Sequence, residues 1–303
     1  MRSIFAAFTI CFSFMLLSPT PNGAAEKEHA SPKKPDSHFT IVSSIKKPTS
    51  DEIARYLEQT WQTFHDVFDV DPAAVSVIII GLPGSGAPSP PSGQERPVGA
   101  RHHQLPWSIK EGEALSSESF STLSHEITHF YFIDYMEDKG GMHQDHAWLH
   151  EAVSCYGEQD SSRKGREQWA RDHINERISF EQLFTMKNPA KESPLVELQA
   201  RLAEKLARGE MKVDEVHRQI AEFAATHRAE LAELTGPRNL TYYAQSLSVF
   251  EFLLKIEGKE FIRTMSQQLK KGKSMAEIIR ALKAYPQGIP QLEEAWVAWV
   301  QAS

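Results

Sequence analysis

Residues 124–129 read SHEITH, so two imidazoles lie four positions apart with a carboxylate beside the first. In an α-helix, which turns about 100° per residue, His125 and His129 are about 40° apart around the axis and about 6 Å apart along it. Both rings then project from one face and can bind one metal ion. Glu126 is rotated to the side, where it can reach a metal-bound water. This H-E-x-x-H pattern predicts one zinc ion per chain, bound by His125 and His129, with Glu126 as general base.

The residues around the pattern predict a buried helix, because apolar side chains occur on all of its sides: Phe120, Leu123, Ile127, Phe130 and Phe132. Burying two His and a Glu without a partner is costly, and a metal ion removes that cost. A short pattern with two free positions also arises by chance. The alternative is therefore a structural His pair on a helix.

A catalytic zinc site takes a third protein ligand. The metzincin pattern supplies a His ten residues after the first, but this chain has Tyr135 there, which excludes that class. The next predicted helix starts near Asp145 and carries His146, His150 and Glu151. His150 and Glu151 point about 100° apart, so at most one of the two can face the first helix.

In this region the chain resembles the gluzincin zinc metallopeptidases, specifically bacterial proteins with a peptidase MA-like domain. In those proteins a Trp-Leu-x-Glu-Gly/Ala segment follows H-E-x-x-H and its Glu completes the metal site. Residues 148–152 read WLHEA, so the resemblance implies Glu151 as the third ligand. We then expect His146 and His150 to lie at the surface or beside the ligands. The family's Gly-x-Met-x-Asn motif is absent, so no aminopeptidase specificity is implied.

Two further side chains on the predicted second helix face the same way as Glu151. Glu158 lies about two helical turns further on, where its carboxylate can accept the free ring N–H of a ligating His. The resemblance includes an acid at about this position, and the alternative is a solvated Glu at the helix end. Cys155 is predicted to be a buried, inert thiol rather than a ligand.

The resemblance also covers residues 242–254, which are similar to the family's Tyr-x-x-Ser helix. It implies Tyr243 as the donor that stabilises the oxyanion opposite Glu126. Tyr242 and His103 are the alternative donors, and a core aromatic is the alternative role for Tyr243.

The elements expected around these residues define an α+β, mostly helical class with a zincin-like (gluzincin) fold. A small N-terminal sheet is predicted from strands at 38–44 and 75–80, with a possible edge strand at 100–109. After residue 116 the pattern is almost wholly helical. Residues 191–235 predict an amphipathic helical hairpin inserted in the domain, and its apolar stripe is predicted to be core rather than a binding surface.

The N-terminus predicts a cleaved signal peptide over residues 1–25. Arg2 is followed by an apolar run at 4–17 and then by small residues. That run is shorter than the about 20 residues of a membrane-spanning helix, so no stable membrane insertion is expected after cleavage. Residues 26–37 are charged and rich in Pro and Ser, which predicts a disordered tether. Residues 38–303 then form the peptidase domain, and we expect a secreted or periplasmic protein.

Composition restricts the partners. The chain has 303 residues and a net charge of −7 without a Lys/Arg-rich block, which argues against a nucleic-acid partner. Loss of the signal peptide removes Cys11 and leaves only Cys155, so no intramolecular disulfide can form. This is typical of a bacterial periplasm or exterior rather than of disulfide-rich eukaryotic secretion.

These features predict a zinc-dependent peptidase that hydrolyses peptide bonds of peptides or proteins outside the cytoplasm, by Glu126-assisted attack of zinc-bound water. The alternative is a non-catalytic binding or structural protein that retains a zincin scaffold. Glu126 argues against it, because an inactive copy has no chemical need for this residue. The sequence leaves the substrate, the endo- or exopeptidase character and the oligomeric state open.

Overall fold

The computed structural model describes residues 38–43, 49–72, 75–81, 103–109, 117–136, 146–189, 213–234 and 236–302, with single residues between 194 and 211. The predicted signal peptide and the predicted tether lie outside these residues. The described chain is mostly helical, as predicted. None of its helices is both long enough and apolar enough to cross a membrane.

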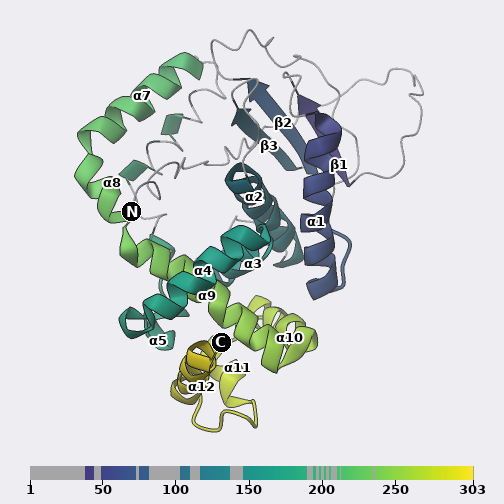
Figure 1. Ribbon diagram of the computed structural model, residues 1–303, viewed down its shortest axis with the longest axis vertical. Coiled ribbons are helices and arrows are strands. Elements are labelled where there is room, and N and C mark those ends of the chain that lie inside the picture. The colour runs from purple at the N-terminus through teal and green to yellow at the C-terminus, as the bar shows by residue number, and fades with distance from the viewer. Residues whose placement is uncertain are drawn as a thin grey trace.

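One small sheet precedes the helical body (Figure 1). Its strands are β1 (Phe39–Ser43), β2 (Val75–Gly81) and β3 (His103–Ile109), in the order β1-β2-β3. Both pairings are parallel, with Phe39 opposite Val75 and Val75 opposite His103. The dense β-branched sequence of β2, VSVIIIG, is typical of a central parallel strand.

Helix α1 (Ser50–Phe68) connects β1 to β2 and packs on the helix that follows the sheet. Its start is fixed by a capping box, in which the Thr49 side chain accepts from the Glu52 backbone and the Glu52 side chain accepts from the Thr49 backbone. One face is buried, and the helix ends at Asp69, which has a left-handed backbone conformation. A buried hydrogen bond of 2.8 Å from the Thr60 hydroxyl to that of Ser124 then links α1 to α2 (Ser117–Met136).

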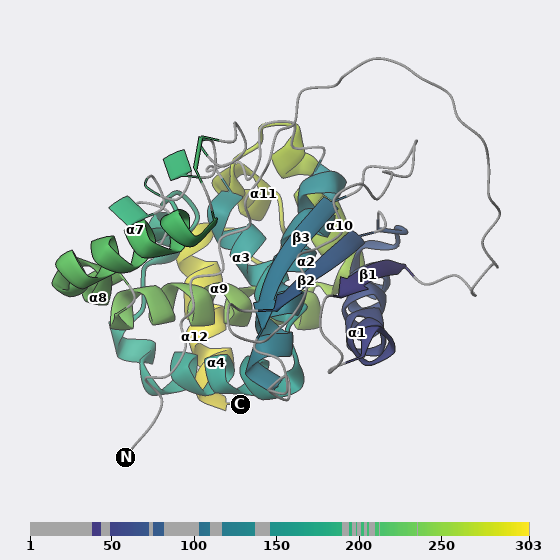
Figure 2. The same cartoon turned by 90° about the horizontal axis from the view of Figure 1, so that it is seen from above.

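The body is built around α2 (Ser117–Met136), α3 (Ala147–Tyr156), α4 (Asp160–Asp172) and α9 (Pro237–Ile256), which pack on one another. Figure 1 shows α2 between the sheet and the α3–α9 pair, and Figure 2 shows the same body from above. The described residues form these further elements: η2 (Ile174–Glu176), α5 (Phe180–Leu183), α7 (Val213–Thr226), α8 (Arg228–Leu234), α10 (Gly258–Lys270), α11 (Met275–Arg280) and α12 (Ile289–Ala302).

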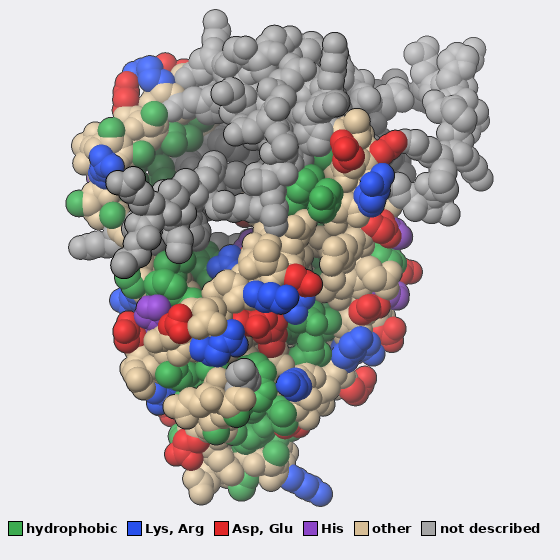
Figure 3. Space-filling view, in the orientation of Figure 1, with side chains coloured by type: hydrophobic (Ala, Val, Ile, Leu, Met, Phe, Trp, Pro, Cys, Tyr) green, Lys and Arg blue, Asp and Glu red, His purple; other side chains and the backbone are tan. Residues whose placement is uncertain are grey.

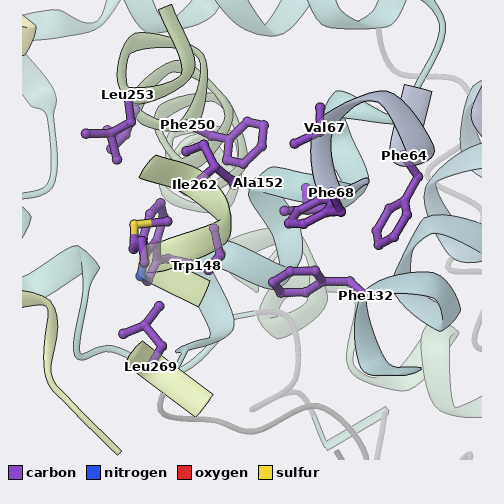
Figure 4. Close-up of a cluster of buried hydrophobic side chains, with 14 of the residues drawn as sticks. Phe64, Val67, Phe68, Phe132, Trp148, Ala152, Phe250, Leu253, Ile262 and Leu269 are labelled. Atoms are coloured by element: carbon purple, nitrogen blue, oxygen red, sulfur yellow. The ribbon is translucent and has the colours of Figure 1, made fainter. Parts of the chain in front are cut away.

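The main core lies among α1, α2, α3, α9 and α10. Figure 4 shows Phe68 of α1 beside Phe132 of α2, and Trp148 of α3 in the same core. Trp148 and Phe132 are completely buried. This core holds α2 and α3, the two helices that carry the predicted metal ligands, against each other.

A second, smaller apolar cluster belongs to the segment predicted as a hairpin. Its buried members are Leu195, Leu198, Leu202 and Val216, with Ile220, Phe223 and Leu231 packed against them. Where the structure describes it, the apolar stripe predicted for residues 191–235 thus packs against itself, with part of it buried. On the face shown in Figure 3, acidic and basic side chains are interspersed over the helical body.

Candidate metal centre

Helix α2 places both imidazoles of the H-E-x-x-H pattern inside the protein. His125 is 9% exposed and His129 is 7% exposed, and apolar neighbours on all sides keep this helix buried. Glu126 differs from the residues around it: from 123 to 133 it is the one side chain that is partly exposed rather than buried. The base predicted from the sequence is therefore the site residue of α2 with the most contact with solvent.

Helix α3 brings the third predicted ligand to the same point. Trp148 and Leu149 are completely buried and fix the start of this helix, and Glu151 follows at 2% exposure. Helices α2 and α3 approach closely at Gly157, the residue directly after the end of α3. A Cβ atom added at Gly157 would collide with the Thr128 hydroxyl, so glycine is required for this approach.

Three atoms converge at the site. The Nε2 atoms of His125 and His129 are 3.1 Å apart, and Glu151 Oε2 lies 3.2 Å from the first and 3.3 Å from the second. Ligand atoms at about 2.0–2.1 Å around a tetrahedral ion are separated by about 3.3–3.4 Å. The triangle therefore has the size that one small metal ion requires, and these side chains could hold a metal ion.

The electrostatics also suit a cation. Burial alone would raise the pKa of the Glu151 carboxyl, but the neighbouring His129 and His125 outweigh it and hold this pKa well below its ordinary value. Burial alone would lower the pKa of His125, but hydrogen bonds with Cys155, Glu151 and Glu158 raise it well above 6.5. The carboxylate is thus ionised at neutral pH, as metal binding requires.

Glu158 orients the first imidazole. Its Oε1 lies 2.8 Å from His125 Nδ1, and the side chain is buried rather than solvated. An Nδ1–H that donates to this carboxylate leaves the Nε2 lone pair for a metal. The helical-face argument for Glu158 was wrong, however: α3 ends at Tyr156, and Glu158 reaches His125 from the turn that follows Gly157.

Arg166 of α4 completes this chain of contacts and was missed in the sequence. Its Nη2 lies 2.7 Å from Glu158 Oε1 and its Nε lies 3.1 Å from Oε2. Burial alone would raise the pKa of Glu158, but Arg166 and then His125 lower it to about 2. Glu158 therefore stays an acceptor for His125. By contrast, Nδ1 of His129 has no hydrogen-bond partner among the described residues.

Asn188, in the segment after α5, was also missed. Its Nδ2 lies 2.6 Å from Glu151 Oε1 and 3.2 Å from the hydroxyl of Tyr243 on α9. The Tyr243 ring lies 6.2 Å from the ring of His125, measured between centroids. Tyr242, the alternative donor, is completely buried in the main core. Nothing is described of the His103 side chain at the start of β3.

The other candidates of α3 are not part of the three-atom site. His150 is completely buried, with its ring 4.8 Å from that of Phe132. The expectation of a surface position is wrong for it, because α3 is buried on every side. His146 is partly exposed at the N-cap. Cys155 is buried 3.9 Å from His125 Nδ1, and burial raises the pKa of its thiol. With His125 and Glu158 it forms a second group whose ligand atoms lie close enough together to hold a metal ion, so its prediction as an inert thiol stays a prediction.

Comparisons of the chain with protein-family models, curated proteins and solved structures found no match.

Proposed function

We propose that this protein is a zinc-dependent peptidase of the gluzincin type that hydrolyses peptide bonds outside the cytoplasm. The observation that carries the proposal is the triangle of His125 Nε2, His129 Nε2 and Glu151 Oε2, with edges of 3.1, 3.2 and 3.3 Å. Two imidazole nitrogens and one carboxylate oxygen are a donor set that suits Zn²⁺.

The protein supplies three ligands, and a catalytic zinc site keeps a fourth position open. When bound, zinc supplies Lewis-acid chemistry: it makes a water molecule acidic and polarises the carbonyl of the substrate. The Glu158–His125 contact supports this assignment, because catalytic zinc sites commonly hold a ligating imidazole by a carboxylate.

The roles of the remaining residues follow from their chemistry. Glu126, partly exposed beside the buried ligands, takes the proton of the attacking water and passes it to the leaving amine. Tyr243 donates a hydrogen bond from its hydroxyl group to the oxyanion of the tetrahedral intermediate. Burial foremost, together with the negative charge of Glu151, raises the pKa of Tyr243 well above 10, so the phenol carries that proton at neutral pH.

The proposal includes the zincin-like fold and the cellular location. The three-stranded sheet that precedes α2 supports a zincin-like arrangement of residues 38–303. Residues 1–25 are proposed to direct export as a cleaved signal peptide, after which residues 26–37 act as a tether. A peptide or protein outside the cytoplasm is the substrate.

Two variants of the purified protein test the proposal. Elemental analysis should find one zinc ion per chain in the wild type and in Glu126→Gln, and none in His129→Ala. A mixed peptide library followed by mass spectrometry should give cleavage with the wild type, and none with Glu126→Gln. Glu210→Gln, which changes an exposed carboxylate, is the control and should cleave like the wild type.

Three outcomes contradict parts of the proposal. A folded wild type without metal at neutral pH removes the zinc site. Zinc binding without peptide cleavage points instead to a binding or structural protein on the same scaffold. Unchanged cleavage by Glu126→Gln removes Glu126 from its role.

A further inference from the structure

Asn188 is the one described side chain for which hydrogen bonds to both Glu151 and Tyr243 are found. It is 2% exposed, and it lies far along the chain from both partners. The first contact, 2.6 Å from Nδ2 to Glu151 Oε1, is short for an amide donor and is typical of a charged acceptor. The second, 3.2 Å from the same nitrogen to the Tyr243 hydroxyl, is an ordinary hydrogen bond.

Chemistry fixes the orientation of this amide. A carboxylate that binds a metal is ionised and can only accept hydrogen bonds, so the group 2.6 Å from Glu151 must be the NH₂ and not the carbonyl oxygen. The NH₂ group has two hydrogens. One is directed to Glu151 and the other to Tyr243, so the tyrosine hydroxyl is the acceptor in its contact with Asn188.

We propose that Asn188 is a positioning residue that holds Glu151 as a one-oxygen metal ligand and directs the hydroxyl proton of Tyr243 to the substrate. This inference rests on the proposed function for the role of Tyr243, whereas its first half needs only a bound metal ion. Neither effect requires Asn188 to touch the metal or the substrate.

The first half follows from the two oxygens of Glu151. Oε2 lies 3.2 and 3.3 Å from the Nε2 atoms of His125 and His129, and Oε1 is bound to Asn188. Without the amide, Oε1 is free to turn toward the metal, and the carboxylate can bind through both oxygens. That change crowds the position that a catalytic site keeps open for water and raises the coordination number from four to five.

The second half follows from the hydroxyl of Tyr243. This group has one hydrogen to donate and can accept as well. Since it accepts from Asn188, its own hydrogen must point elsewhere. A catalytic donor gains from such preorganisation, because no reorientation is then needed when charge develops on the substrate.

Two substitutions of Asn188 test these effects, and an unfolding measurement shows whether each variant still folds. Asn188→Leu removes both donors at similar size, and Asn188→Asp keeps the shape but replaces the NH₂ with a second carboxylate oxygen. Lys187→Leu changes the neighbouring exposed side chain and is the matched control. Thermal unfolding followed by circular dichroism identifies the variants that keep the fold.

Metal binding tests the first half without any assay of activity. In competition with a chelator, Asn188→Leu should bind zinc about 10- to 100-fold more weakly than the wild type, the usual loss when a partner of a ligand is removed. With Co²⁺ as the probe in place of zinc, the visible absorption of the bound Co²⁺ should be weaker in Asn188→Leu than in the wild type. This is expected when the coordination number rises from four to five. If Asn188→Leu and Asn188→Asp fold and keep the wild-type zinc affinity and the wild-type Co²⁺ spectrum, the first half of the proposal is overturned.

A double-mutant cycle with Tyr243→Phe tests the second half. Asn188→Leu should lower kcat while KM stays close to the wild-type value, and the further loss of kcat should shrink when Tyr243 is already Phe. If the two substitutions lower kcat independently, so that their fold-losses multiply in the double variant, the second half of the proposal is overturned. If the wild type cleaves no peptide, the proposed function and this half fail together, whereas the Co²⁺ spectra still decide the role of Asn188 at the metal.

Discussion

Replacing Glu158 with Gln tests whether the buried ion pair with Arg166 stabilises the fold around His125. The substitution keeps the size of the side chain and removes its charge. Arg166 then loses both charged contacts, at 2.7 and 3.1 Å, and remains largely buried. An unpaired buried charge is strongly destabilising, by about 3–5 kcal/mol in measured cases.

The expected magnitude follows from the pKa of Glu158, which falls from its ordinary value of 4.5 to about 2 in the fold. At about 1.4 kcal/mol per pKa unit, the difference corresponds to about 3 kcal/mol of stability. No discount for solvent screening is needed, because the Glu158 side chain is 3% exposed. The two arguments agree on the size of the effect.

The pH dependence has a definite sign. Because the folded pKa of Glu158 is lowered, its contribution is fully present above pH 4.5, where the carboxyl is ionised in the folded and the unfolded chain. As the pH falls below 4.5, the unfolded chain takes up the proton first. The contribution is therefore lost progressively and is gone once the pH passes below about 2.

The assay is urea unfolding of wild type and Glu158→Gln in excess chelator, so that metal binding does not contribute. At pH 7 the variant should be less stable by about 3 kcal/mol, and the gap should close as the pH falls from 4.5 toward 2. Glu176→Gln, an exposed carboxylate in η2, should change little. An equal stability at pH 7, or a gap that stays constant into acid, would refute the reasoning.

Two further predictions concern the elements that support the site. Gly157→Ala should destabilise the protein by about 1–3 kcal/mol through overpacking, because the new Cβ collides with the Thr128 hydroxyl; urea unfolding should show partial recovery in Gly157→Ala/Thr128→Ala, and no recovery would contradict this contact. Thr49→Ala should cost about 1 kcal/mol by removing the capping box with Glu52, whereas Thr49→Ser should stay close to the wild type; equal stability of all three proteins would exclude a contribution from the cap.

The sequence by itself determined the local part of the site. The spacing of His125 and His129 places both rings on one face of any helix that contains them, because the period of a helix is fixed by its backbone. The apolar residues around them predicted a buried helix, because the same helical period places these residues on all of its sides. A single turn of helix therefore carried two of the three converging atoms and the candidate base.

The tertiary structure decided everything that joins separate elements. The rotation of α3 about its axis, set by the burial of Trp148 and Leu149, turns Glu151 toward the imidazoles of α2 and packs His150 against Phe132. Because Phe132 also belongs to α2, the expectation that at most one of the two residues can face this helix was wrong. Periodicity gives relative directions within one helix but not the direction of the neighbouring helix, so it could not choose between these residues.

Arg166 and Asn188 lie in other elements and have no local pattern that connects them to the site. Their contacts arise from the packing of α4 and of the segment after α5. Glu158 was named from the sequence for the wrong reason, since it acts from a turn and not from a helical face. Contacts between distant segments depend on how whole elements pack, and a single sequence records only the spacing along the chain.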